Sequence, residues 1–210
     1  VFRMKRRRET TAICLRVGPV SVDAHCGTPS YGTLDSTDTL DIIVKSLADL
    51  DFEGTVTFRQ PVGGWRVDPA LAFAHALQES NFRERVVSPA GAIGLMQIMP
   101  ITQREYAASL NMSTGADLKD PAVNLAFGQR TLEALSTAGY TQGRLPKIMA
   151  AYNAGPSPVA RWESEIRDQG DPLLYMESIP YWETRGYVAI VTRNYWMYLR
   201  QADAPAPSRI

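Results

Sequence analysis

The sequence is poor in the residue types that build thiol and metal sites. Its 210 residues include two cysteines, Cys14 and Cys26, and two histidines, His25 and His75. From Pro61 onward no thiol and a single imidazole remain. This excludes a cysteine nucleophile, a disulfide scaffold and a His/Cys-rich metal site from the larger part of the chain. Acid/base chemistry there must rest on carboxylates.

Net charge and long apolar runs are absent as well. Lys+Arg and Asp+Glu each number 22, so no overall field would draw the protein to nucleic acid or to an anionic membrane. No apolar run approaches the roughly 18 residues that a membrane-spanning helix needs. A chain of this length fits one good-sized domain with an extension, and it is too short for two full domains.

The first 60 residues differ from the rest in their sequence pattern, and we expect them to form an N-terminal extension. The basic run at 5–8 leads into an apolar stretch at 11–15, which is typical of the start of an export signal. Arg16 ends that stretch early, and no clean small-residue cleavage site precedes Cys26. A disordered basic tail is the alternative interpretation, so this segment does not establish export.

Residues 36–50 predict one amphipathic helix within the extension. Its apolar stripe consists of Leu40, Ile43, Val44, Leu47 and Leu50. A short extended piece is expected at 55–58, and the Gly/Pro-rich stretch 60–64 marks the boundary to a main domain at 61–201. The Pro/Ala-rich tail at 202–210 is expected to fray.

Asp-Pro pairs predict three helix starts in the main domain. Asp accepts hydrogen bonds from the free amides at a helix start, and Pro is tolerated at the first helical position. The pairs are Asp68-Pro69, Asp120-Pro121 and Asp171-Pro172. Apolar spacing continues these helices through 70–77, 125–135 and 173–176, and predicts two more at 145–154 and about 181–200. Because no convincing strand-type alternation appears, the expected fold class is mainly α.

A carboxyl stands at the end of the first predicted helix. Glu79 lies within the stretch 78–82, and a carboxyl at the polar end of an otherwise apolar helix becomes half-buried, which raises its pKa. A glycosidic general acid needs such a raised pKa. Taken alone, a helical glutamate is more typical of a solvated surface. His75 lies four residues earlier on the same helical face, where a lone histidine is more often part of the packing than of the catalysis.

A glycine-containing cluster follows at 88–100. Its glycines permit unusual backbone angles or close approach, and Gln97 is a polar residue among apolar neighbours. A buried amide needs hydrogen-bond partners, which in a cleft are sugar hydroxyls, acetamido groups or the catalytic carboxyl itself. Taken alone, the segment fits a loop and a core helix equally well.

Two further clusters place polar and aromatic side chains at helix ends. In 150–156, small residues let a helix approach a neighbour closely and Gly-Pro ends it, which leaves Tyr152 and Asn153 at the helix terminus. In 179–188, aromatic residues flank Glu183. Aromatic faces suit stacking on sugar rings, although buried aromatics more often belong to a core.

In this order the four clusters resemble the soluble lytic murein transglycosylases, a lysozyme-like family of bacterial cell-wall enzymes. The resemblance covers about residues 65–200, and no motif position is missing. The matching motifs are Glu79-Ser80, Gly94-Leu95-Met96-Gln97, Ala151-Tyr152-Asn153-Ala154-Gly155 and Glu183-Thr184-Arg185-Gly186-Tyr187-Val188. The resemblance implies a lysozyme-like helical catalytic domain with Glu79 as its catalytic residue. The stretch 117–124 also looks family-like, in a structural role.

By the same resemblance, further side chains would line the cleft around the catalytic glutamate. These residues are Ser88, Gln97, Met99, Tyr152, Asn153 and Glu183. Glu183 is expected to support the site and not to act as the acid or base. The implied partner is the glycan strand of peptidoglycan, which locates the protein in the periplasm or cell envelope. No metal or organic cofactor is called for, and a monomer is expected.

The expected reaction uses one carboxylate. Ordinary glycosidases need two, one to protonate the leaving oxygen and one to attack or to activate water. The resemblance implies that Glu79 protonates the bond between N-acetylmuramic acid and N-acetylglucosamine. Glu79 then takes the proton of the muramoyl C6 hydroxyl, which leaves a 1,6-anhydro end. Two alternatives stay open: a goose-type lysozyme-like hydrolase of the same bond, and a catalytically silent glycan-binding module.

Overall fold

The computed structural model describes residues 14–17, 20–23 and 61–201. Near the start of the chain, strands β1 (Cys14–Val17) and β2 (Val20–Asp23) pair antiparallel, with Cys14 opposite Asp23 and Val17 opposite Val20. The sequence did not predict this pair. Four residues are too few for the side-chain alternation of a strand to stand out.

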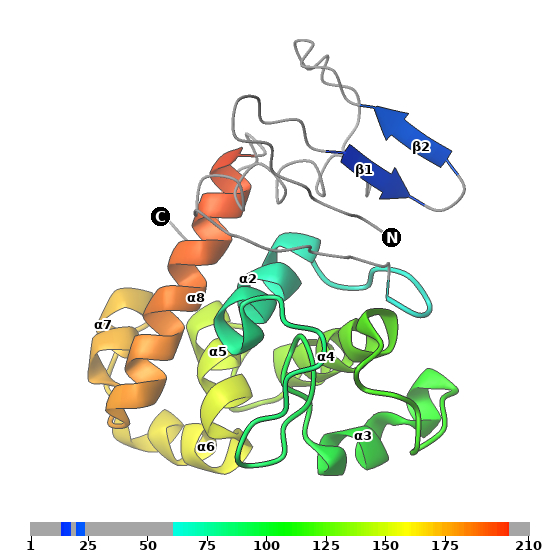
Figure 1. Cartoon of the computed structure of the whole chain (residues 1–210). Coiled ribbons are helices and arrows are strands. Elements are labelled where there is room, and N and C mark those ends of the chain that lie inside the picture. Colours follow the sequence, from blue (N-terminus) through cyan, green and yellow to red (C-terminus); the bar gives the residue numbers. More distant parts are fainter. Residues whose placement is uncertain (1–13, 18–19, 24–60, 202–210) are drawn as a thin grey trace.

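The rest of the described chain is mainly helical, which confirms the mainly α prediction (Figure 1). The helices are α2 (Pro69–Ser80), α3 (Pro100–Tyr106), α4 (Pro121–Ser136), α5 (Leu145–Ala154), α6 (Pro156–Glu165), α7 (Pro172–Ser178) and α8 (Trp182–Gln201), with a short 3-10 turn η1 at Ala108–Leu110. None of the described helices is long and apolar enough to cross a membrane.

The Asp-Pro pairs start helices as predicted. The carboxylate of Asp68 accepts a hydrogen bond from the Ala70 amide at 2.9 Å, and Asp120 caps α4 in the same way. Asp171 accepts from two amides at the start of α7. Each cap satisfies donors that the helix itself leaves free, so the starts of α2, α4 and α7 are encoded locally.

The core forms around α2, which packs against α8 and α4, while α8 also packs along α5 and α7 (Figure 1). Three alanines of α2, Ala72, Ala74 and Ala76, are fully buried, and their small side chains let the neighbouring helices approach closely. Phe73 is fully buried beside them and meets the ring of Trp65 edge to face. Apart from the buried His75, the middle of α2 is therefore apolar, and its other polar residues gather toward its C-terminal end.

The segment between α2 and α3 is a loop that is fixed onto α4. Asn124 is 1% exposed; its amide donates to the carbonyls of Ile93 and Leu118, and its oxygen accepts from the Met96 amide. Gly94 has φ +77°, and a Cβ there would collide with the Asn124 amide and the Leu118 carbonyl. The structural role expected for 117–124 is thus to hold this loop in place.

Some predicted elements differ from those in the structure, and others lie outside the residues that it describes. The stretch 88–100, which fitted a loop or a core helix, is a loop up to Met99, and α3 begins at Pro100. Helices α3 and α6 were not predicted. The Gly155-Pro156 pair ends α5 as expected, but it also starts α6. The predicted helix at 36–50, the extended piece at 55–58 and the tail at 202–210 lie outside the described residues.

Candidate active site

Glu79 lies in the last turn of α2, as predicted, and is half-buried. The Tyr187 hydroxyl of α8 donates a hydrogen bond to Glu79 Oε1 at 2.6 Å. Burial raises the pKa of Glu79 to about 7, and the hydrogen bond from Tyr187 opposes that rise. Among the described residues no ion pair involves Glu79. A carboxyl in this state can hold a proton near neutral pH and release it.

A cavity of about 330 Å³ opens in front of this carboxyl, and we call it the Glu79 pocket. Its lining residues come from the end of α2, the end of α5 and the first half of α8: Gln78, Glu79, Asn153, Trp182, Glu183, Gly186, Tyr187 and Ile190. The pocket therefore brings together Glu79, Asn153 and Glu183, three of the residues that the sequence predicted for the site.

An adjoining cavity of about 410 Å³ extends the site along the start of α8. The two cavities share Asn153, Trp182 and Glu183. The Trp182 side chain is 82% exposed, an unusual state for so large an apolar ring. Thr184 donates to the Asn153 side-chain oxygen at 2.8 Å, so the ends of α5 and α8 are joined where they border the cavity.

Tyr152 lies on the inner side of the site. Its hydroxyl donates to the Met96 carbonyl at 2.8 Å, which ties α5 to the loop before α3. Burial raises the pKa of Tyr152 well above its ordinary value, and the negative charge of Glu79 adds to that rise. The Tyr152 hydroxyl is thus neutral and lies close enough to Glu79 for the charge of the carboxylate to raise its pKa.

Ser88, Gln97 and Met99, which were also predicted, lie on the loop between α2 and α3. The Gln97 amide donates to the Gly94 carbonyl at 2.8 Å, and Gln97 has an uncommon φ of +47°. The Ser88 hydroxyl accepts from the Ala92 amide at 3.0 Å. Met99 is 36% exposed. These hydrogen bonds shape the loop, and contact of the three side chains with a substrate stays a prediction.

Two residues that touch the acid or its partner were not among the predicted site residues. Tyr187 stands in the quoted motif 183–188, and its position one helical turn after Glu183 was the available signal. His75 is fully buried, and its Nδ1 lies 2.8 Å from the Tyr187 hydroxyl. Its ring centroid lies 4.7 Å from that of Tyr152, so the packing role expected for His75 is present together with a polar contact.

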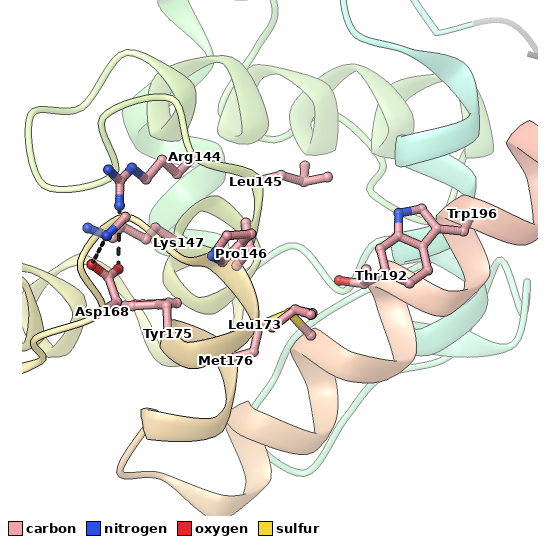
Figure 2. Close-up of a pocket in the computed structure, with 12 residues that line it drawn as sticks. Arg144, Leu145, Pro146, Lys147, Asp168, Leu173, Tyr175, Met176, Thr192 and Trp196 are labelled. Carbon is pink, nitrogen blue, oxygen red and sulfur yellow. Dashed lines mark hydrogen bonds and ion pairs between the residues drawn. The ribbon is translucent and has the colours of Figure 1, made fainter. Parts of the chain in front are cut away.

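A second pocket, of about 220 Å³, lies between the start of α5, the loop before α7, α7 and α8; we call it the α7 pocket (Figure 2). Figure 2 shows Arg144 and Asp168 at one end of it and Trp196 at the other. Arg144 pairs with Asp168 at 3.4 Å, and Lys147 pairs with Glu163. The α7 pocket shares no lining residue with the Glu79 pocket, and its charged side chains are paired.

Comparison with known proteins points to one family. The family model described as transglycosylase SLT domain matches residues 57–174. The match ends within α7, so Glu183 and Tyr187 come to the site from outside the matched range.

Relatives and solved structures point the same way. The soluble lytic murein transglycosylase of Escherichia coli K12 is 38% identical over 136 residues, which is 62% of this chain and 20% of that protein. The crystal structure of the 70 kDa soluble lytic transglycosylase of Escherichia coli matches with a TM-score of 0.59 and 33% identity, over 68% of this chain and 24% of that one. An inactive glutamate-to-glutamine mutant of the lytic transglycosylase Slt from Pseudomonas aeruginosa matches with a TM-score of 0.60 and 32% identity, over 68% and 23%.

The chain thus spans about a fifth to a quarter of the length of these relatives. Within that span it shares the helical fold of the solved lytic transglycosylases and carries the motifs that produced the resemblance. On the family match and these identities, the chain belongs to the transglycosylase SLT domain family, whose members include the soluble lytic murein transglycosylases.

Proposed function

We propose that the protein is a lytic transglycosylase that cleaves the β-1,4 bond between N-acetylmuramic acid and N-acetylglucosamine in peptidoglycan without consuming water. The observation that carries the proposal is the state of the Glu79 carboxyl. It is half-buried, it accepts a hydrogen bond from the neutral Tyr187 hydroxyl, and its pKa is raised to about 7. Such a group acts as an acid in one step and as a base in the next at the same pH.

In the proposed first step, protonated Glu79 donates its proton to the glycosidic oxygen, and the bond from that oxygen to C1 of the muramoyl residue breaks. The 2-acetamido group of the substrate stabilises the positive C1. In the second step, the Glu79 carboxylate accepts the proton of the C6 hydroxyl as the C6 oxygen closes onto C1. The product is a 1,6-anhydro ring, Glu79 is again protonated, and one carboxylate has served both steps.

The other predicted residues have supporting roles in this proposal. Asn153 and Glu183 border the Glu79 pocket, where their polar groups can meet the sugar next to the cleaved bond. Gln97, Ser88 and Met99 would reach the substrate from the loop before α3. Charge that develops at C1 is best met by dipoles already in position, and loop and helix ends held by hydrogen bonds supply such dipoles.

One solved structure supports an essential glutamate. In the Pseudomonas aeruginosa protein one glutamate-to-glutamine exchange accompanies an inactive state. The proposed substrate locates the protein in the bacterial cell envelope, and we propose that it acts there as a monomer.

Product analysis tests the proposal. Purified peptidoglycan is digested with the protein and with Glu79→Gln, and the released fragments are analysed by mass spectrometry. We expect 1,6-anhydro ends with the wild type and no release by the variant. Reducing ends would show the goose-type lysozyme-like hydrolase, in which water attacks C1. Binding of glycan without release by either protein would show a catalytically silent module.

A further inference from the structure

Three polar side chains form a line behind the Glu79 pocket. His75 and Glu79 stand four residues apart on α2, and Tyr187 of α8 lies between their side chains. The Tyr187 hydroxyl lies 2.8 Å from His75 Nδ1 and 2.6 Å from Glu79 Oε1. Both hydrogen bonds join positions more than one hundred residues apart in sequence, so the packing of α8 on α2 creates the line.

The number of protons available to these three side chains decides which atom donates in each of the two hydrogen bonds. A tyrosine hydroxyl carries one proton, and Tyr187 donates that proton to Glu79. The contact at 2.8 Å between Tyr187 and His75 then needs its proton from the imidazole, so His75 Nδ1 donates and the Tyr187 oxygen accepts. A neutral imidazole has one N–H group, and therefore Nε2 carries none.

The surroundings of the imidazole favour the same arrangement. His75 Nε2 is buried and has no hydrogen-bond partner among the residues that the structure describes. A buried lone pair without a donor is tolerated better than a buried N–H without an acceptor, and this favours a bare Nε2. Burial also lowers the pKa of His75 to about 3, so the ring does not take up a second proton near neutral pH.

We propose that His75 is a positioning residue that, as its Nδ1–H tautomer, holds the Tyr187 hydroxyl proton on Glu79 Oε1 and so reserves Oε2 for the proton that the acid donates. The proposal rests on the proposed function, because it states which oxygen of Glu79 carries the proton that the acid donates in that reaction. His75 itself touches neither substrate nor reacting atoms.

This arrangement serves both steps of the reaction. While Glu79 is protonated, its Oε1 is the carbonyl oxygen and accepts from Tyr187, so the acid proton sits on Oε2. After the proton leaves, the same hydrogen bond becomes charge-assisted and strengthens without any movement of Tyr187. The titratable groups that face this line are Tyr152 from α5, which stays neutral, and Glu183 from α8, which lines the same pocket.

The tautomer can be measured on the intact protein. Because the chain has two histidines, a His25→Gln variant labelled with 15N-histidine shows the ring of His75 alone. We expect long-range 1H–15N spectra to show a protonated-type Nδ1 and an unprotonated-type Nε2, unchanged from about pH 5 to about pH 8. The reverse pattern, or a ring that titrates within this range, overturns the proposal.

A pair of variants tests the consequence for Glu79. His75→Leu removes the donor, whereas His75→Asn keeps an N–H close to the position of Nδ1. In the leucine variant we expect kcat to fall about tenfold with KM unchanged, and the alkaline limb of the pH profile to move to higher pH, because Glu79 loses a well-directed donor to its carboxylate. The asparagine variant should restore both.

An alkaline limb that stays in place in a folded His75→Leu variant contradicts the proposal, as does an asparagine variant that behaves like leucine. If neither variant folds, the wild-type tautomer decides the question. Failure of the proposed function is separately visible, because a protein without lytic activity still yields the histidine spectrum and a 13C titration of Glu79.

Discussion

The Glu79 pocket and the α7 pocket differ in how their charged side chains are paired. In the α7 pocket each charged lining side chain has a partner of opposite sign, Arg144 with Asp168 and Lys147 with Glu163. In the Glu79 pocket the half-buried carboxyl receives a hydrogen bond from a neutral tyrosine, and its pKa rises to about 7. A partner of opposite sign offsets the cost of taking a charge out of water, whereas an unpaired carboxyl with a raised pKa in a cleft is suited to proton transfer.

The same chemical change in the two regions should therefore have different effects. We expect Glu79→Gln to lower the rate of glycan cleavage by about a thousandfold or more, because the amide has no acidic proton to give. Glu163→Gln, the matched exchange beside the α7 pocket, should leave the rate per folded molecule unchanged. Release of soluble fragments from labelled peptidoglycan measures both. Equal losses in the two variants would erase the distinction between the pockets.

The raised pKa also predicts how the acid affects stability. A carboxyl with a higher pKa in the folded than in the unfolded chain favours folding below its ordinary pKa of 4.5, and this contribution is lost as the pH rises to about 7. Over that range the free energy of unfolding should fall by about 3 kcal/mol relative to Glu79→Gln, which carries no titrating group. Urea unfolding of both proteins at several pH values checks this. Parallel stabilities at all pH values would contradict the raised pKa.

The ion pair at the α7 pocket should matter for stability alone. The Lys147 side chain is 5% exposed and its partner Glu163 is 27% exposed, so loss of the carboxylate leaves a cation largely out of water. We expect Glu163→Gln to lower the free energy of unfolding by about 2 kcal/mol, less than for a fully buried pair because Glu163 is partly solvated. Combining it with Lys147→Met should recover part of the loss, as measured by chemical denaturation. A double variant less stable than Glu163→Gln would argue against the pairing.

The smallest effect is expected from exposed apolar side chains at the two pockets. Trp182→Ala removes a ring that is 82% exposed beside Glu183, and we expect KM for glycan strands to rise about fivefold, or about 1 kcal/mol, through lost stacking. Leu173→Ala is the control, since Leu173 is 59% exposed at the α7 pocket. Steady-state kinetics on defined glycan fragments measures both. A similar KM for the two variants would exclude a stacking role for Trp182.

Three of the five helices that the sequence predicted, α2, α4 and α7, begin with signals that act over a few residues, whereas α5 has no side-chain cap and was predicted from its apolar spacing. Asp68, Asp120 and Asp171 cap their helices with their own carboxylates, and this chemistry is legible in the sequence. Helices α3 and α6 also begin with proline, but the preceding Met99 and Gly155 make no side-chain cap. Their starts depend on how the chain packs, and packing is not visible in a short stretch of sequence.

The features of the site can likewise be separated into those that depend on local sequence and those that depend on packing. The position of Glu79 at the end of an apolar helix was predictable, because it depends on the pattern of α2 alone. The hydrogen bond from Tyr187 was not, because it spans 108 residues and exists only when α8 lies on α2. Gln97 shows a third case: its side-chain amide donates to the Gly94 carbonyl three residues away, a local contact that the sequence did not predict, and contact of Gln97 with a substrate stays a prediction.

Both ends of α2 are held by α8. Near the start of α2, the Tyr195 hydroxyl donates to Asp68 at 2.7 Å, and near its end the Tyr187 hydroxyl donates to Glu79. These are the first and last helices of the domain, so a ribosome has to synthesise nearly all of it before the acid acquires its partner. During synthesis Glu79 is therefore present long before Tyr187 can donate a hydrogen bond to it. The proposed cleavage of glycan strands would begin only once the domain is complete.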